Sequence, residues 1–361
     1  MANFQHFIRP TAERPPSLVS VTIVSALVGL VTGAAGFSLM RAIYPADTII
    51  TGSGNDTTNI KIKFDEPLTV VANQLDQHLA AVYTHVEQSG QAINQLYSDK
   101  EYIGTALIAT SDGWLIFPAG AVLPAQIDIV VNNKVYRPSE QSIDSVAGVR
   151  FIKIDASNLS PIRFARDDEL YQGSTLVFEQ AHLVAGYLFD RTIVRQVNAI
   201  DSTSKASQVH GPSLVDQTTL TEYVSSDPMF FFGLSGSVVG LGQNGKMLPA
   251  YYLNAAVDKF LAKSSYVSVG LYYLDLYRLP GHKEDEGVLV YNPAKAAVVV
   301  NSPASKAGIK PGDIITAVGG TAISLTNNNS LGKLLLGYKA GDSTKLTVIR
   351  ASKQQEITVQ F

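Results

Sequence analysis

The chain has 361 residues and a formal net charge of −3, with 16% charged residues and no cysteine. The missing cysteines exclude disulfides, thiolate metal sites and a cysteine nucleophile. A slightly acidic chain without a basic block is not expected to bind nucleic acid, and no spacing of ligand residues indicates a metal or a cofactor. The length predicts two or three domains and is sufficient to bury a sizeable core.

The N-terminal region predicts a membrane anchor. Residues 1–16 are polar and carry two arginines, and residues 17–40 contain no charge. About 20 such residues span a bilayer, and the arginines favour a cytoplasmic N-terminus with the main domains outside the cytoplasm. We therefore expect a single-pass protein of the cell membrane, with 1–16 as its cytoplasmic tail. A cleaved signal peptide is the alternative, although its apolar region is usually shorter. Gly29 and Gly33 leave homo-oligomerisation through this helix open.

Beyond the anchor, the sequence predicts a linker, then a helix, then a series of strands. Residues 41–66 are rich in Thr, Gly, Asn and Asp and are predicted to be a linker. Residues 68–95 place apolar side chains at helical spacing and predict a helix. From Ile103 onward, short apolar segments alternate with turn signals, which predicts a β-barrel or sandwich. The expected strands are 105–110, 114–117, 127–131, 134–136, 149–154, 173–178 and 192–200.

One segment has the form of an enzyme's nucleophile loop. Asp227 is followed, after five residues, by the run Gly233-Leu234-Ser235-Gly236-Ser237. Glycines let the backbone turn sharply, so that a serine hydroxyl stands clear and nearby N–H groups can point at an oxyanion. Gly-x-Ser-Gly by itself is also an ordinary glycine-rich turn.

This segment resembles the nucleophile segment of trypsin-like serine proteases of the HtrA/Deg family, where the run reads Gly-Asn-Ser-Gly-Gly. Leu234 stands in place of the asparagine and Ser237 in place of the last glycine. Further matches to the family occur in the same order at 104–113, 151–155, 168–173 and 197–200. The resemblance covers about 70–262. It implies a mainly β chain with a trypsin-like double β-barrel domain, which we expect to span 67–262.

The resemblance also implies a Ser-His-Asp triad, and two of its members are missing. By the matched stretches, the His position falls on Gly120 and the Asp position on Gly148, while Ser235 keeps the nucleophile position. A serine hydroxyl needs a base within hydrogen-bond reach and a group that orients the base. We therefore expect Ser235 to be vestigial and the domain to be catalytically inactive. The alternative is a rewired base, for which His182 and His210 are the candidates.

A second resemblance covers the C-terminal part of the chain. The run 302–320 contains Ser-Pro-Ala, Lys-Ala-Gly and Pro-Gly-Asp and looks like the PDZ-domain segment of HtrA proteins. We expect an α+β PDZ domain over 266–361. Its residues predict a short helix at 304–307, a strand at 314–318, a helix at 331–338 and final strands at 345–349 and 356–361.

A PDZ domain implies the binding of peptides or protein C-termini by strand addition. The carboxylate-binding loop corresponds to Ser268-Val269-Gly270-Leu271, where the glycine lets backbone approach the ligand. Leu331 and Leu335, one helical turn apart, are expected to line the pocket for the terminal side chain. Because a groove is open to solvent, Gly270→Asp and Leu335→Lys should weaken binding without unfolding the domain. The alternative is that this domain only packs on the protease-like domain.

Two functional hypotheses remain. The first is a membrane-anchored, inactive HtrA-like protein that acts as an adaptor, scaffold or regulator, with an active protease or an envelope protein as its partner. The second is a serine endopeptidase that uses Ser235 with a non-standard base. A fluorophosphonate probe distinguishes them, because it labels only an activated serine.

Overall fold

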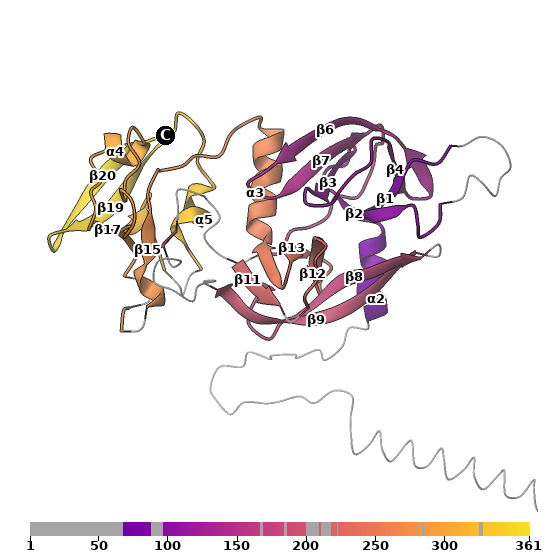
Figure 1. Ribbon diagram of the computed structural model, residues 1–361, viewed down its shortest axis with the longest axis horizontal. Coiled ribbons are helices and arrows are strands. Elements are labelled where there is room, and N and C mark those ends of the chain that lie inside the picture. The colour runs from indigo at the N-terminus through magenta and orange to yellow at the C-terminus, as the bar shows by residue number, and fades with distance from the viewer. Residues whose placement is uncertain are drawn as a thin grey trace, which may run out of the picture. The chain divides into compact units, whose positions relative to one another are not determined.

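The computed structural model describes residues 68–87, 97–166, 169–183, 186–199, 209–210, 218–221, 223–279, 281–283, 286–324 and 328–361. The predicted tail, membrane helix and linker lie outside these residues, and no helix within them is long and apolar enough to cross a membrane. The described chain is mainly β (Figure 1), as expected, and its strands form one open sheet, one closed barrel and a C-terminal sheet.

The first sheet has seven antiparallel strands in the order β5-β4-β1-β2-β3-β7-β6. The strands expected at 105–110, 114–117, 127–131 and 134–136 form two hairpins, since β2 pairs with β3 and β4 pairs with β5. Asn132 and Asn133 join the second hairpin with positive φ angles of 49° and 60°, as a two-residue turn of the primed type requires. The strands are β1 (Leu79–Thr84), β2 (Tyr102–Ile108), β3 (Trp114–Pro118), β4 (Ile127–Val131), β5 (Lys134–Tyr136), β6 (Pro138–Asp144) and β7 (Val149–Ile154).

The predicted helix at 68–95 is wrong over its second part. Helix α2 (Leu68–Asp76) ends after nine residues, and Leu79–Thr84 is strand β1. Strand β1 lies between β2 and β4, and five of its six residues are buried. A strand buried on both faces has no polar alternation, so its apolar residues also fit a helical period.

The second group of strands closes into a barrel in the order β11-β14-β13-β12-β8-β9. Helix α3 (Ala250–Leu261) follows it and packs against β13 on one side. On the other side it reaches the first sheet, where the rings of Phe260 and Phe151 stack with centroids 4.0 Å apart. The barrel strands are β8 (Thr175–Leu183), β9 (Gly186–Ala199), β11 (Thr218–Thr221), β12 (Met229–Gly233), β13 (Val238–Gln243) and β14 (Lys246–Pro249).

Three consecutive phenylalanines make β12 part of the core. Phe231 packs inside the barrel against Phe178, while Phe230 and Phe232 join a cluster that includes Leu75 of α2. All three are at most 4% exposed. The strand also pairs with β13 on one edge and β8 on the other. Strand β12, which leads to Ser235, is therefore fixed by pairing on both edges and by apolar packing on both faces.

The C-terminal sheet has the order β10-β15-β16-β17-β19-β20, with β18 paired to β17. The expected strands at 314–318, 345–349 and 356–361 are confirmed with small shifts of their ends. The strands are β10 (Val209–His210), β15 (Tyr273–Asp275), β16 (Val288–Val290), β17 (Ile314–Val318), β18 (Thr321–Ala322), β19 (Ser343–Arg350) and β20 (Lys353–Gln360). The helical elements are η4 (Leu276–Arg278), α4 (Pro303–Lys306) and α5 (Leu331–Leu335).

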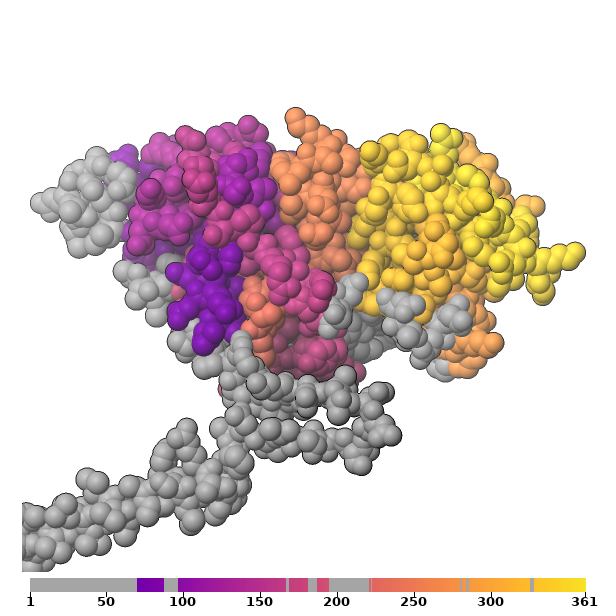
Figure 2. Space-filling view, turned by 180° about the vertical axis from the view of Figure 1, so that it is seen from behind, coloured from indigo at the N-terminus to yellow at the C-terminus, as the bar shows by residue number. Residues whose placement is uncertain are grey.

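Helix α3 also contributes to the core of the C-terminal domain. Tyr252 is 1% exposed and belongs to the same apolar cluster as Leu271 and Leu335. Tyr266 donates a hydrogen bond of 2.7 Å to the carboxylate of Asp144 in the first sheet. In Figure 2 the surface of α3 (orange) adjoins that of the C-terminal sheet (yellow). The C-terminal domain thus packs on residues that precede it in the chain.

Candidate functional site

Ser235 lies at the tip of the turn between β12 and β13. The N–H of Gly233 donates to the carbonyl of Ser237 over 2.8 Å, and the N–H of Gly236 donates to the carbonyl of Gly233 over 2.9 Å. Gly236 has a φ angle of +73°, which a glycine adopts without steric cost. An oxyanion hole needs free N–H groups that point at one place. Here the N–H of Gly233, two residues before Ser235, is used to close the turn.

The hydroxyl of Ser235 is held by an ion pair that the sequence did not predict. Ser235 Oγ accepts a hydrogen bond from Arg163 Nη2 at 2.9 Å and donates one to Glu169 Oε2 at 3.0 Å. Arg163 and Glu169 face each other through two parallel contacts of 2.7 Å and 3.1 Å. The buried Ser237 hydroxyl, at the position of the last glycine of the family pattern, lies 2.8 Å from Ser235 Oγ and 3.1 Å from Glu169 Oε2.

The electrostatics of this cluster make Glu169 a poor base. Its hydrogen bonds from Arg163, together with those from the Arg166 N–H and the two serines, lower its pKa from 4.5 to about 2, although burial opposes the shift. A general base works best when its pKa lies near the operating pH. A carboxylate with a pKa of about 2 therefore takes the serine proton poorly, and the arginine also occupies a lone pair of the Ser235 oxygen.

Gly120 and Gly148 lie next to each other in space. The N–H of Ala119, which precedes Gly120, donates to the carbonyl of Gly148 over 2.9 Å. A Cβ atom at Gly120 would lie 3.5 Å from Pro228, and one at Gly148 would have no neighbour within 4 Å. The nearest acid to Gly148, Asp144, is already used: its carboxylate accepts from two backbone N–H groups and from Tyr266. Among the described residues, no acid or histidine side chain lies within 4 Å of a Cβ atom placed at either glycine.

The candidate replacement bases lie in other parts of the chain. His182 pairs with Tyr187 near the far end of β8, six residues beyond Leu176, which pairs with Gly233. Six residues of strand span about 20 Å, farther than a histidine side chain reaches. His210 lies on β10, in the C-terminal sheet. The histidines with described side chains have partners elsewhere: His78 pairs with Ser160, His85 with Asp128 and His282 with Glu286.

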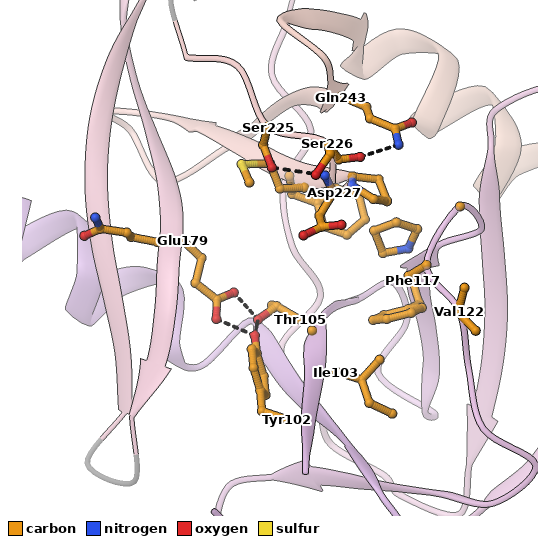
Figure 3. Close-up of a pocket in the computed structure, with 18 of the residues that line it drawn as sticks. Tyr102, Ile103, Thr105, Phe117, Val122, Glu179, Ser225, Ser226, Asp227 and Gln243 are labelled. Carbon is orange, nitrogen blue, oxygen red and sulfur yellow. Dashed lines mark hydrogen bonds between the residues drawn. The ribbon is translucent and has the colours of Figure 1, made fainter. Parts of the chain in front are cut away.

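A cleft of about 530 Å³ opens beside Gly120, and Ser235 is not among the residues that line it. On one wall the carboxylate of Glu179 accepts hydrogen bonds from the hydroxyls of Tyr102 and Thr105 (Figure 3). Burial raises the pKa of Glu179. Across the cleft lies Asp227, and the described lining residues include no histidine, lysine or arginine. Within the described part of the chain, the cleft at the expected His position is therefore lined by neither Ser235 nor a cationic side chain.

The predicted carboxylate-binding loop, residues 268–271, is tightly packed in the C-terminal domain. Gly270 has a φ angle of +75°, and a Cβ atom there would lie 2.2 Å from Cβ of Ser302. The carbonyl of Gly270 accepts from the N–H of Val299 over 2.9 Å, and its N–H donates to Ser268 Oγ over 3.2 Å. Any side chain at position 270 would therefore displace the start of α4 as well as strain the backbone.

Leu331 and Leu335 lie on α5 and are 0% and 3% exposed. They share one apolar cluster with Leu271 and Tyr273, so the helix faces the strand that follows the loop. The expectation that Leu335→Lys leaves the domain folded is corrected by this burial, because a lysine there would place a charge in the core. The role of these residues in peptide recognition remains a proposal.

Sequence reasoning missed two features of these sites. Glu169 lies within the stretch 168–173, which matches the family, and Arg163 precedes it; neither was given a role. The signal available was Ser237, whose hydroxyl at a usual glycine position indicates a changed hydrogen-bond network. The second feature is β10, which is only two residues long and pairs with β15 across more than sixty positions of sequence.

Comparison with known proteins supports the resemblance in both halves of the chain. The family model of the PDZ domain matches residues 276–361. A probable periplasmic serine endoprotease of the DegP-like type from Pseudomonas putida strain F1 is 23% identical over 281 residues, which are 72% of this chain and 56% of that protein. A DegP-like protein from Brucella suis is 30% identical over 145 residues, which are 36% of this chain and 27% of that protein. The chain thus spans about half the length of the first of these relatives.

Solved structures of HtrA-type proteases also resemble this chain in fold. The HtrA-type protease AlgW with a decapeptide aligns with a TM-score of 0.51 at 15% identity, covering 81% of this chain and 98% of that one. AlgW with a tripeptide aligns with a TM-score of 0.52 at 15% identity, covering 81% and 96%. The chain therefore resembles HtrA-type proteases, with a mainly β, trypsin-like protease fold and a C-terminal PDZ domain.

Proposed function

We propose that this protein is a catalytically inactive, membrane-anchored relative of the HtrA proteases that binds peptides or protein C-termini through its PDZ domain. One observation carries the inactivity: the Ser235 hydroxyl is hydrogen-bonded to the Arg163–Glu169 ion pair, with no histidine in reach among the described side chains. Without its base, a serine triad keeps only a residual acceleration, several powers of ten below the intact enzyme.

Labelling with a fluorophosphonate probe tests this proposal. The full-length chain in detergent is compared with its Ser235→Ala variant and with AlgW as a positive control. We expect labelling of the chain to equal that of Ser235→Ala. Strong labelling that disappears in Ser235→Ala would contradict the proposal, because it requires an activated serine.

A serine endopeptidase is the second candidate function, and the names of the curated relatives favour it. In this case Glu169 is the described carboxylate within hydrogen-bond reach of Ser235 and would have to serve as the base. Glu169→Gln would then abolish activity while the turn stays closed by its backbone hydrogen bonds. If the protein is inactive, neither the wild type nor Glu169→Gln cleaves casein. Comparing casein cleavage by these two proteins therefore distinguishes an inactive protein from a serine endopeptidase.

Peptide binding is supported by the PDZ match and by the solved structures of AlgW with peptides. The groove proposed for this chain consists of the loop 268–271, strand β15 and helix α5, with Leu331 and Leu335 beneath the terminal side chain. The probe is a fluorescein-labelled pool of decapeptides ending in Val, Leu or Phe. Binding of the free-carboxylate pool, and not of the same pool with C-terminal amides, is expected because the loop recognises a carboxylate. Equal binding of both pools would contradict this mode.

The anchor at 17–40, the cytoplasmic N-terminus and partners in the cell envelope also belong to this proposal. They are supported by the uncharged run in the sequence and the arginines before it. Protease added to intact spheroplasts should digest the C-terminal domains. Digestion that requires lysis would contradict the orientation.

A further inference from the structure

Strand β15 follows the predicted carboxylate-binding loop and is the strand on which a PDZ ligand would add. One of its edges pairs with β16, where Tyr273 lies opposite Val290 and Leu274 opposite Leu289. The other edge pairs with β10, where Tyr273 lies opposite His210 and Leu274 opposite Val209. A strand has only two hydrogen-bonding edges. The edge available for strand addition is therefore occupied by a segment of the same chain.

The hydrogen bonds identify Tyr273 as the residue that faces this edge. The carbonyl of Tyr272 accepts from the N–H of Tyr291, and the N–H of Leu276 donates to the carbonyl of Gly287, so both residues face the β16 side. Backbone groups alternate in direction along a strand. Tyr273 consequently presents its N–H and C=O to the opposite edge, where β10 lies.

The segment runs in the direction of a bound C-terminal peptide. Its chain passes from Val209, opposite Leu274, to His210, opposite Tyr273. Each step along it therefore leads toward Gly270, three residues before Tyr273. A peptide whose carboxylate reaches the loop at Gly270 would pair with β15 in the same antiparallel sense. Strand β10 has both the place and the polarity of such a ligand.

The origin of β10 links this edge to the protease-like domain. Strands β9 and β11 are neighbours in the barrel, with Ala199 paired to Thr218. In the sequence, β10 lies within residues 200–217 between these two barrel strands, while its own pairing partner, β15, belongs to the PDZ sheet. Connections longer than about 12–15 residues are uncommon and are usually functional.

We propose that Val209–His210 is an internal ligand of the PDZ domain, which a C-terminal peptide must displace from β15 before it can bind. This inference rests on the proposed peptide-binding function. A competitor tethered to the same chain has a high effective concentration and lowers the fraction of domains that can accept a peptide. It pairs through only two residues, so a longer peptide with its carboxylate can replace it.

The test weakens the backbone pairing of β10 and leaves the groove intact. In the variant V209P/H210P both N–H groups of β10 are lost, and proline fits poorly into a paired strand. The control V209T/H210T changes both side chains but keeps the N–H groups and a residue type that favours strands. Each full-length protein is titrated with the fluorescein-labelled free-carboxylate decapeptide pool. Amide exchange at Tyr273 is followed by hydrogen–deuterium exchange without peptide.

We expect V209P/H210P to bind the pool about tenfold more tightly than the wild type, and V209T/H210T to bind like the wild type. The Tyr273 amide should exchange faster in the proline variant only. Equal affinity of the wild type and proline variant, or equal exchange at Tyr273, would overturn the internal ligand and leave the proposed function standing. If no protein binds the pool in a carboxylate-dependent way, the proposed function fails and the internal ligand with it. A difference in Tyr273 exchange would then mean that β10 only covers a strand edge.

Discussion

The turn around Ser235 and the loop around Gly270 retain the family pattern to a similar degree, yet they retain different capacities. At the turn, the pattern survives in Gly233, Ser235 and Gly236, but glycine stands at the two positions where the family has the base and its orienting acid. At the loop, the pattern survives in Gly270, whose positive φ and contact with Ser302 hold the backbone in place. The turn at Ser235 has the family's backbone pattern without the family's helper side chains. The proposed peptide binding at Gly270 depends mainly on the backbone.

The difference follows from what each function requires. Nucleophilic catalysis depends on particular side chains at hydrogen-bond distance, so the proposed inactivity needs no more than glycine at the two helper positions. Strand addition depends on backbone N–H and C=O groups, which every residue except proline supplies. Peptide recognition therefore tolerates sequence change that catalysis does not. At β15, competition from the chain itself, rather than loss of groups, is what limits it.

The largest effect is expected from introducing histidine and aspartate at the two glycine positions, which tests the contrast between the Ser235 turn and the Gly270 loop. We expect the variant Gly120→His with Gly148→Asp to remain at least about 1,000-fold below AlgW in casein cleavage. The reason is that Ser235 is still held by Arg163 and Glu169 and the Gly233 N–H still closes the turn. Cleavage near the rate of AlgW would mean that the turn rearranges once a base is present, and that only the two glycines prevent catalysis.

A second experiment separates packing from recognition in α5. Leu335→Lys should lower the free energy of unfolding by about 3 kcal/mol or more, because it removes a buried leucine and buries a charge. The matched control is Leu334→Lys, one position earlier and only half-buried, for which we expect about 1 kcal/mol. Urea unfolding of the full-length chain, followed by circular dichroism, measures both. Similar losses would indicate that α5 moves away from β15 in solution and leaves Leu335 exposed.

The smallest expected effect concerns the ion pair at Ser235. The pKa of Glu169 is lowered from 4.5 to about 2 by its hydrogen bonds with Arg163 and its neighbours. A lowered pKa means that the carboxylate stabilises the fold fully above about pH 4.5 and that this contribution is lost as the pH falls toward 2. Glu169→Gln should therefore lower the melting temperature by about 2–4 °C at pH 7 and by less near pH 2.

Its control is Glu140→Gln, in the exposed part of β6, which removes a carboxylate and leaves the Arg163–Glu169 pair intact. A constant difference between wild type and Glu169→Gln across this pH range would show that the pair with Arg163 does not form in solution. The Ser235 hydroxyl would then lack its hydrogen bonds to Arg163 and Glu169. The turn at Ser235 and the loop at Gly270 would differ less than the structure indicates.

Local patterns were enough for much of the fold. The strands expected at 127–131 and 134–136 are present, and Asn132 and Asn133 between them adopt successive positive φ angles, which few residue types do. The strand 149–154 alternates and was placed correctly. Strand β1 was missed because a strand buried on both faces has no alternation. Strand β12 was not among the expected strands, because three consecutive phenylalanines show no alternation either.

What the sequence by itself determined is that glycine stands at 120 and 148, where the resemblance implies the base and its orienting acid, and glycine has no side chain wherever the chain places it. Only the tertiary structure decided which side chains contact Ser235. Arg163 and Glu169 reach Ser235 across 72 and 66 positions of sequence, and His210 reaches Tyr273 across the boundary between two domains. Such contacts leave no periodicity in the chain, because they depend on how strands pair and not on which residues are neighbours.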